Sequence, residues 1–199
     1  MINEEIICLD NVLGFNVMKD IKNILYSSNF NWHYILETET GHNLDAGSFA
    51  NVVFQSNHRI DPEISIKLEM CLMSALDTVK LKLAELLRIR VGMALKSNFV
   101  ESHLPHVDNP HQHLVAIMYL TTCDAPTLIY NEQYDTTTPT IGSYEFYNKK
   151  LNSKVTIKQK IDCIENRMVI FNGSYYHSGT KPTNVGRRIV INFDFTTHD

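Results

Sequence analysis

The chain of 199 residues lacks the features of several large protein classes. No apolar run approaches the roughly 18 residues of a membrane span. The acidic start, from Met1 to Glu5, has no basic stretch followed by an apolar one, so we expect no signal peptide. A net charge of -4 gives no broad cationic field for nucleic acid or anionic membranes. We therefore expect a cytoplasmic protein without a membrane partner. The charge disfavours a nucleic-acid partner, for which Lys181 with Arg187 and Arg188 is the only dense basic candidate. No pattern indicates an oligomeric state.

Cysteine is also scarce, and its scattered positions favour free thiols over a disulfide framework or a zinc knuckle. The four cysteines are Cys8, Cys71, Cys123 and Cys163. None forms a CxxC pair, which is the spacing typical of zinc knuckles. Free thiols in a reducing cytoplasm are the expected state.

Composition and length favour one domain. Hydrophobic residues make up 44% and charged residues 20% of the chain, which is ordinary for a globular protein with a core. A chain of this length suits a single domain. We expect an N-terminal α/β extension over residues 1–87, packed on a core over residues 88–196.

The sequence of the N-terminal part predicts short strands and one short helix. Glu4 to Asp10 is expected to form a strand, and apolar residues at helical spacing predict a helix from an N-cap at Asn16 to Ser27. Trp32 to Leu36 and Phe49 to Phe54 are predicted strands, separated by a polar loop.

A long helix is predicted next. Asp61-Pro62-Glu63 combines an N-cap, a proline at the first helical position and an acid near the positive end of the helix dipole. Apolar residues then continue to Leu87, which predicts one helix over about 62–87, roughly 39 Å long. We expect this helix to brace one face of a sheet.

The rest of the chain is typical of β structure. The predicted strands are Arg88–Leu95, Leu114–Leu120, Thr127–Tyr130, Ser143–Tyr147, Val155–Lys158, Met168–Phe171 and Arg188–Phe195. Many short strands punctuated by Gly, Pro, Asn and Asp favour a sandwich or barrel, here a jelly roll (double-stranded β-helix). The fold class is thus α+β and mainly β. The polar segment Asn131 to Gly142 is either a surface excursion or a lid over a site.

Histidines crowd the segment from Ser102 to His113. A cupin-like site at His111-Gln112-His113 would need a glutamate a few residues later, and an apolar run follows instead. A zinc-protease site would need two histidines four apart on a helix, with a glutamate between them, and the chain has no such run.

His106-Val107-Asp108 offers a third interpretation. Side chains two apart lie on the same side of an extended segment. With one distant histidine they would complete a 2-His-1-carboxylate facial triad, which leaves open positions on a non-haem Fe(II). His177 follows a predicted strand and a turn, and an arginine pair, Arg187-Arg188, begins the next strand. The candidate metal ligands are therefore His106, Asp108 and His177.

This order of motifs resembles the Fe(II)/2-oxoglutarate-dependent dioxygenase superfamily, over about Leu87 to Phe195. The run His106-Val107-Asp108-Asn109-Pro110 is most similar to the prolyl-hydroxylase branch and to small bacterial and phage members. Tyr119 matches a family tyrosine whose hydroxyl shares the cosubstrate carboxylate. Asp124-Ala125-Pro126-Thr127 stands where members often carry a Gly-Gly pair.

The resemblance implies the chemistry. Fe(II) would bind 2-oxoglutarate and O2, and oxidative decarboxylation would yield succinate and CO2 while a C–H bond is hydroxylated. It favours a peptidyl or free amino-acid side chain as substrate, either a protein or peptide or a small molecule. The alternatives are an oxygenase for a nucleobase or another small molecule, and a non-catalytic jelly-roll module that binds metal.

The far carboxylate of that cosubstrate needs a cation in a planar fork, which suits arginine. If Arg188 points inward, so do Val190, Asn192 and Asp194, while four apolar residues face outward toward the helix. If Arg187 points inward, the polar Asn192 and Asp194 face the helix. The sequence thus favours Arg188 over Arg187, with Asn192 on the same face as a further candidate for cosubstrate contact.

Overall fold

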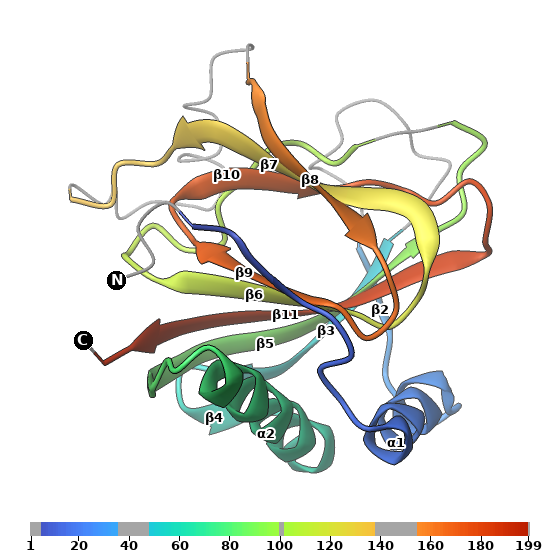
Figure 1. Cartoon of the computed structure of the whole chain (residues 1–199). Coiled ribbons are helices and arrows are strands. Elements are labelled where there is room, and N and C mark those ends of the chain that lie inside the picture. Colours follow the sequence, from blue (N-terminus) through green and yellow to red (C-terminus); the bar gives the residue numbers. More distant parts are fainter. Residues whose placement is uncertain (1–4, 36–47, 100–101, 138–154, 199) are drawn as a thin grey trace.

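The computed structural model describes residues 5–35, 48–99, 102–137 and 155–198. In these parts the protein is mainly β, with two helices and two antiparallel sheets. The larger sheet lies between the smaller sheet on one side and the two helices on the other (Figure 1). This layering leaves the inner face of the larger sheet turned toward the smaller one.

The strands of each sheet come from distant parts of the chain. In order, the larger sheet contains β1 (Ile7–Leu9), β9 (Met168–Asn172), β6 (Leu114–Tyr119), β11 (Arg187–Thr197), β5 (Leu83–Leu95), β3 (Ser48–Gln55) and β2 (His33–Ile35), and β4 (His58–Arg59) pairs with β3. The smaller sheet contains β10 (Tyr175–Gly179), β7 (Cys123–Gln133) and β8 (Ile157–Cys163). The predicted strands with described residues are present, with shifted ends.

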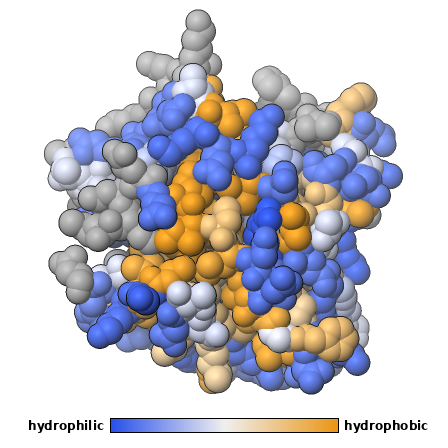
Figure 2. All heavy atoms as spheres, in the orientation of Figure 1, coloured by the Kyte–Doolittle hydropathy of each residue, from blue (hydrophilic) through white to orange (hydrophobic). Residues whose placement is uncertain are grey.

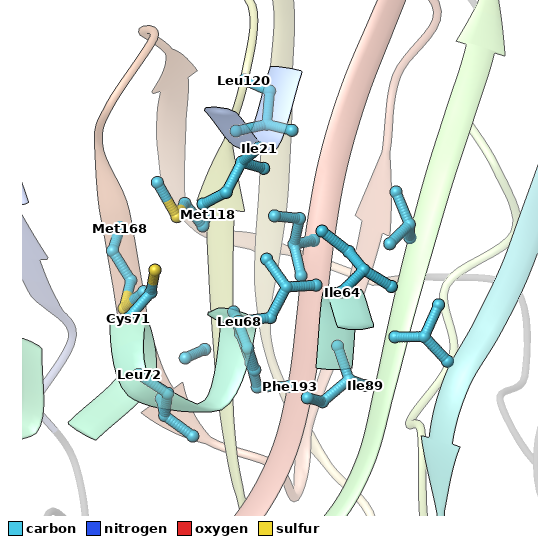
Figure 3. Close-up of a cluster of buried hydrophobic side chains, with 14 of the residues drawn as sticks. Ile21, Ile64, Leu68, Cys71, Leu72, Ile89, Met118, Leu120, Met168 and Phe193 are labelled. Atoms are coloured by element: carbon cyan, nitrogen blue, oxygen red, sulfur yellow. The ribbon is translucent and has the colours of Figure 1, made fainter. Parts of the chain in front are cut away.

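The helices α1 (Phe15–Tyr26) and α2 (Pro62–Thr78) cover the outer face of the larger sheet. Figure 3 shows Ile64 and Leu68 of α2 beside Ile89 of β5 and Phe193 of β11, and all four side chains are fully buried. Burial of such side chains stabilises the fold by about 1.5–3 kcal/mol each. The expectation that a helix braces the sheet is confirmed.

The alternation predicted for β11 is confirmed. Ile189, Ile191, Phe193 and Phe195 are buried in the helix-side core. The intervening positions 188, 190 and 192 line a cavity on the opposite face of the sheet. A one-residue shift would exchange the two sets, so the apolar set fixes which face the polar set occupies.

The predicted end of the long helix is wrong. α2 ends at Thr78, and residues from Leu83 onward belong to β5. Lys80 adopts a positive φ of 57°, and the amide of Leu81 donates to Leu76 O, which closes the helix end. A run rich in leucine fits a helix and a buried strand equally, so apolar periodicity did not reveal this reversal.

Two smaller differences concern element ends. α1 begins at Phe15 with Gly14 as its N-cap, not Asn16. The segment Asn131 to Gly142 is not all loop, because β7 extends to Gln133. The predicted strand Ser143–Tyr147 lies outside the described residues. β10 was not predicted as a strand at all.

The surface hydropathy and the state of the cysteines agree with the expectations drawn from the composition. Figure 2 shows hydrophobic side chains gathered in the middle of one face, with hydrophilic side chains around them. All four cysteines are free thiols, as predicted. Among the described residues, neither helix has the length and apolar character to cross a membrane.

Candidate functional site

Two segments far apart in sequence meet through a single backbone bridge. The His106 amide donates to His177 O at 3.0 Å, and the His177 amide donates to His106 O at 2.9 Å. The two imidazole rings therefore lie side by side, with centroids 4.8 Å apart. β10 carries His177, and its pairing with β7 holds that strand in the smaller sheet.

Asp108 completes a cluster with these histidines. One ligand atom from each of His106, Asp108 and His177 lies within 4.8 Å of the others. His177 Nε2 and Asp108 Oδ2 are 3.1 Å apart. Two ligands at right angles, each about 2.1 Å from a metal, lie roughly 3 Å from each other. The three residues thus fit a divalent metal with a facial set of ligands.

Backbone carbonyls set the tautomer of both imidazoles. His106 Nδ1 donates to Leu104 O at 2.9 Å, and His177 Nδ1 donates to Tyr175 O at 3.2 Å. A carbonyl only accepts, so in each neutral ring the proton is on Nδ1. A neutral ring therefore carries its lone pair on Nε2, which is the arrangement that metal-binding histidines need. Without a metal, the protonated form of His177 donates from Nε2 to Asp108 Oδ2.

The Asp108 carboxylate is held ionised. Its side chain is only 6% exposed, and burial alone would raise its pKa. The charge of Arg88, the hydrogen bond from His177 and the charge of both histidines together hold the pKa well below its ordinary value. Asn192 Nδ2 also donates to Asp108 Oδ2 at 2.9 Å. The same hydrogen bond to Asp108 raises the pKa of His177, although burial opposes that rise.

Arg88 joins this carboxylate to a second one. It pairs with Asp108 Oδ1, and its Nε lies 2.8 Å from Asp194 Oδ2. Burial and the nearby charge of Asp108 raise the pKa of Asp194 to about 7, against the opposing charge of Arg88. Sequence reasoning missed Arg88, because it was assigned only to a strand end. The available signal was its position two residues before Arg90, which puts both arginines on one face of the predicted strand.

A cavity of about 290 Å³ opens over the cluster. Its described wall includes the three cluster residues together with Arg188, Asn192 and Thr127. Arg188 is 5% exposed, and Arg187 is exposed and lies over the ring of Tyr26 at 4.6 Å. Of the two adjacent arginines, Arg188 is the one that reaches the cavity.

Fixed acceptors hold the guanidinium of Arg188. Nε donates to Ala125 O at 3.1 Å, and Nη2 donates to Thr127 Oγ1 at 2.8 Å. The Tyr119 hydroxyl donates to the same Thr127 oxygen at 2.7 Å, and Arg188 Cζ lies 5.5 Å from the Tyr119 ring centroid. Tyr119 is fully buried behind Thr127 and is not in the cavity wall. Thr127 was missed as a site residue, because only the sheet pairing brings it to Arg188.

The remaining histidines of the crowded segment lie apart from the cluster. His103 lines the cavity, and His111 is exposed. His113 is buried, donates from Nδ1 to His111 O at 2.7 Å, and has no described partner at Nε2.

Comparison with known proteins gave matches among structures only. No family model matches the sequence, and no curated protein does so either. A 2OG-Fe(II) oxygenase family oxidoreductase from Burkholderia pseudomallei aligns with a TM-score of 0.64 at 9% identity, over 98% of this chain and 86% of that one. A prolyl hydroxylase from Trichoplax adhaerens, solved with a hypoxia inducible factor oxygen degradation domain peptide fragment, gives 0.57 at 16% identity, over 96% and 83%. HygX from Streptomyces hygroscopicus, with nickel and 2-oxoglutarate bound, gives 0.56 at 11% identity, over 96% and 82%.

These similarities establish the fold. Each covers nearly all of this chain at low identity, so the likeness lies in the arrangement of the elements rather than in the sequence as a whole. The resemblance inferred from the motifs is confirmed at that level.

Proposed function

We propose that this protein is an Fe(II)- and 2-oxoglutarate-dependent oxygenase built on a jelly-roll core. One observation carries the proposal: His106, Asp108 and His177 place their ligand atoms within 4.8 Å of one another, in a cavity that also contains Arg188. Fold alone would not support it, because one fold hosts many functions. The residues of the site supply the argument.

His106, Asp108 and His177 would hold the iron, with imidazole Nε2 atoms and one carboxylate oxygen as ligands. Fe(II) in such a site, with 2-oxoglutarate and O2, would supply oxidative decarboxylation to succinate and CO2 and oxidation of a substrate C–H bond. The backbone acceptors at Leu104 and Tyr175 orient the two rings. Asn192 and Arg88 fix the carboxylate of Asp108, so the ligands need little rearrangement when the metal enters.

Arg188 would bind the far carboxylate of 2-oxoglutarate. A guanidinium offers a planar fork that matches a carboxylate, and Arg188 is nearly buried at the cavity wall. Thr127 orients it from the side, and Tyr119 supports Thr127. Asn192 also lines the cavity, so a cosubstrate contact from this residue stays a prediction.

The substrate would be a peptidyl or free amino-acid side chain that is hydroxylated at a C–H bond. The prolyl-hydroxylase-like run at His106 to Pro110 supports this, and so does the fold shared with a prolyl hydroxylase solved with a peptide. We expect the reaction to take place in the cytoplasm, where four free thiols stay reduced.

A non-catalytic metal module would use the same ligands differently. Structural metal sites are normally closed by protein ligands on all sides. Here three candidate ligands face a cavity with a buried arginine in its wall, which favours a site that admits further ligands.

One experiment tests the oxygenase directly. Fe(II) and 2-oxoglutarate are added to the folded protein without oxygen, and the visible metal-to-ligand charge-transfer absorption is measured. O2 is then admitted and succinate is quantified. We expect both signals, and their absence in folded, metal-loaded protein would overturn the proposal.

A further inference from the structure

The cavity contains an arginine that the proposed chemistry does not use. Along β5, residues Arg88, Arg90, Gly92 and Ala94 alternate onto the cavity side, opposite Asp194, Asn192, Val190 and Arg188 of β11. Arg90 therefore faces Asn192, whose amide donates to Asp108. Arg90 thus lies on the strand beside β11, whose Asn192 contacts the candidate metal ligand Asp108.

The head of Arg90 extends over Gly92. A Cβ built on Gly92 would lie 3.7 Å from Arg90 Nη1 and 3.7 Å from Val190 Cγ2. The missing side chain at Gly92 leaves that space to the cavity, so the guanidinium lies along its wall. Arg90 is only half-buried, which leaves it accessible to a molecule in the cavity.

The three arginines of the cavity wall differ in what holds them. Arg88 pairs with both Asp108 and Asp194, and Arg188 donates to Ala125 and Thr127. Within residues 5–35, 48–99, 102–137 and 155–198, the side chain of Arg90 makes no hydrogen bond or ion pair. Among the described residues of this wall, Arg90 is thus the arginine whose guanidinium has no protein acceptor.

The charges leave one positive group unmatched. The described wall carries Arg88, Arg90 and Arg188 against Asp108, and Asp194 lies behind Arg88. An Fe(II) ion would add two positive charges, and 2-oxoglutarate would add two negative ones. Arg188 would neutralise the far carboxylate of the cosubstrate, and the metal would neutralise the near one. Among the groups of the described wall, Arg90 then remains without an anion.

We propose that Arg90 binds a carboxylate of the substrate, so that this protein acts on free amino acids or similar small carboxylic acids rather than on a residue inside a peptide. The inference rests on the proposed oxygenase function. Interior residues of a peptide carry no α-carboxylate, whereas a free amino acid presents one near its reactive side chain. Arginine binds such a group through two parallel hydrogen bonds.

The test compares free L-amino acids with their C-terminal amides. Each compound is added to protein loaded with Fe(II) and 2-oxoglutarate, and succinate formation is measured above the rate without substrate. Binding is measured separately without oxygen, from the change in the charge-transfer absorption. We expect at least one free acid to bind and to stimulate succinate formation, and its amide to be weaker by about 10- to 100-fold.

Two variants and a control locate the effect. Arg90→Gln should remove the preference for the acid over the amide, while the 2-oxoglutarate concentration for half-saturation stays within about twofold of wild type. Arg90→Lys keeps the charge without the fork and should retain part of the preference. Arg187→Gln removes an exposed arginine from the same strand pair. It should change neither the preference for the acid over the amide nor the 2-oxoglutarate concentration for half-saturation.

The outcomes separate this inference from the function beneath it. If wild type shows neither the charge-transfer absorption nor succinate formation, the proposed oxygenase function itself is overturned. With both signals present, the Arg90 inference is overturned if no free amino acid stimulates, if amides act equally well, or if Arg90→Gln keeps the preference. It is also overturned if Arg90→Gln weakens 2-oxoglutarate binding as Arg188→Ala does, because Arg90 would then serve the cosubstrate.

Discussion

Asp108 and Arg88 form an ion pair at the centre of the candidate metal site, on the oxygen that Asn192 and His177 leave free. Arg88 therefore neutralises the carboxylate when no metal is bound. Replacing it with methionine should destabilise the metal-free protein by about 3–5 kcal/mol, the usual cost of a buried charge left without its partner. Added Mn(II) or Co(II) should then raise the melting temperature more in Arg88→Met than in wild type.

Thermal unfolding with and without metal measures this effect. Arg59→Met is a matched control, because Arg59 pairs with Glu69 at a more exposed position and its loss should cost no more than about 1 kcal/mol. Equal metal-induced shifts in Arg88→Met and wild type would show that Arg88 does not act on Asp108.

The metal ligands can be separated from a nearby bystander. His106→Ala should lower the affinity for Co(II) by more than about 100-fold, because loss of a direct ligand exceeds the usual 10- to 100-fold effect of an outer partner. His111→Ala should leave the affinity unchanged, since His111 is exposed and lies outside the cluster. Calorimetric titration measures both. Comparable losses in the two variants would contradict the assignment.

The two adjacent arginines give the sharpest test of cosubstrate binding. Arg188→Ala should raise the 2-oxoglutarate concentration for half-maximal succinate formation by about 10- to 100-fold, because hydrogen bonds to a charged group are lost. Arg187→Ala should leave it unchanged, since Arg187 lies over Tyr26. The opposite pattern would mean that another group than Arg188 anchors the cosubstrate.

Asp194 makes the stability of the metal-free protein depend on pH. Its pKa is about 7 in the fold against an ordinary 3.8, so the folded state binds more protons than the unfolded state between these values. Stability should therefore fall as pH rises through this window, by at most about 1.4 kcal/mol per pH unit for one proton.

Asp194→Asn removes that titration and should flatten the dependence. Urea unfolding at several pH values, in the presence of a chelator, gives both slopes. The exposed Asp20 on α1 provides a control, and Asp20→Asn should keep the wild-type slope. A parallel dependence in Asp194→Asn and wild type would rule out Asp194 as the source.

Gly173 allows the backbone to approach the ring of His113. A Cβ at this position would lie 2.3 Å from His113 Nε2, so Gly173→Ala should destabilise the protein by about 1–3 kcal/mol. Adding His113→Ala should recover part of that loss, since the clashing ring is then absent. Gly186→Ala meets nothing within 4 Å and should be neutral. Chemical denaturation of wild type, Gly173→Ala, His113→Ala and the double variant measures the coupling between the two positions.

Much of the site could be predicted because its residues follow strong local patterns. The strict alternation from Arg188 to Phe195 fixed which residues face the helices, and burial of the apolar set left the polar set facing the cavity. His106 and Asp108, two apart, needed only one further histidine to make a metal site.

Other parts depended on contacts that no local pattern records. The helix end at Thr78 depends on a positive φ at Lys80, a residue type with no special preference for that conformation. Thr127 and Arg88 become site residues only through sheet pairing and an ion pair between distant segments. Thr127 has no distinctive neighbour in sequence, and the one local signal for Arg88 is Arg90, two residues later.

The pairing of β5 with β11 has a consequence for how this protein can evolve. On both strands, alternate positions face either the helix-covered core or the cavity. Mutations at Arg90, Gly92 or Val190 alter the cavity wall and leave the helix-side core intact, so substrate preference can drift at little cost to folding. A single-residue insertion in β11 would instead exchange the two faces at once. Substitutions can thus change this site without unfolding the protein, whereas insertions or deletions within the strand cannot.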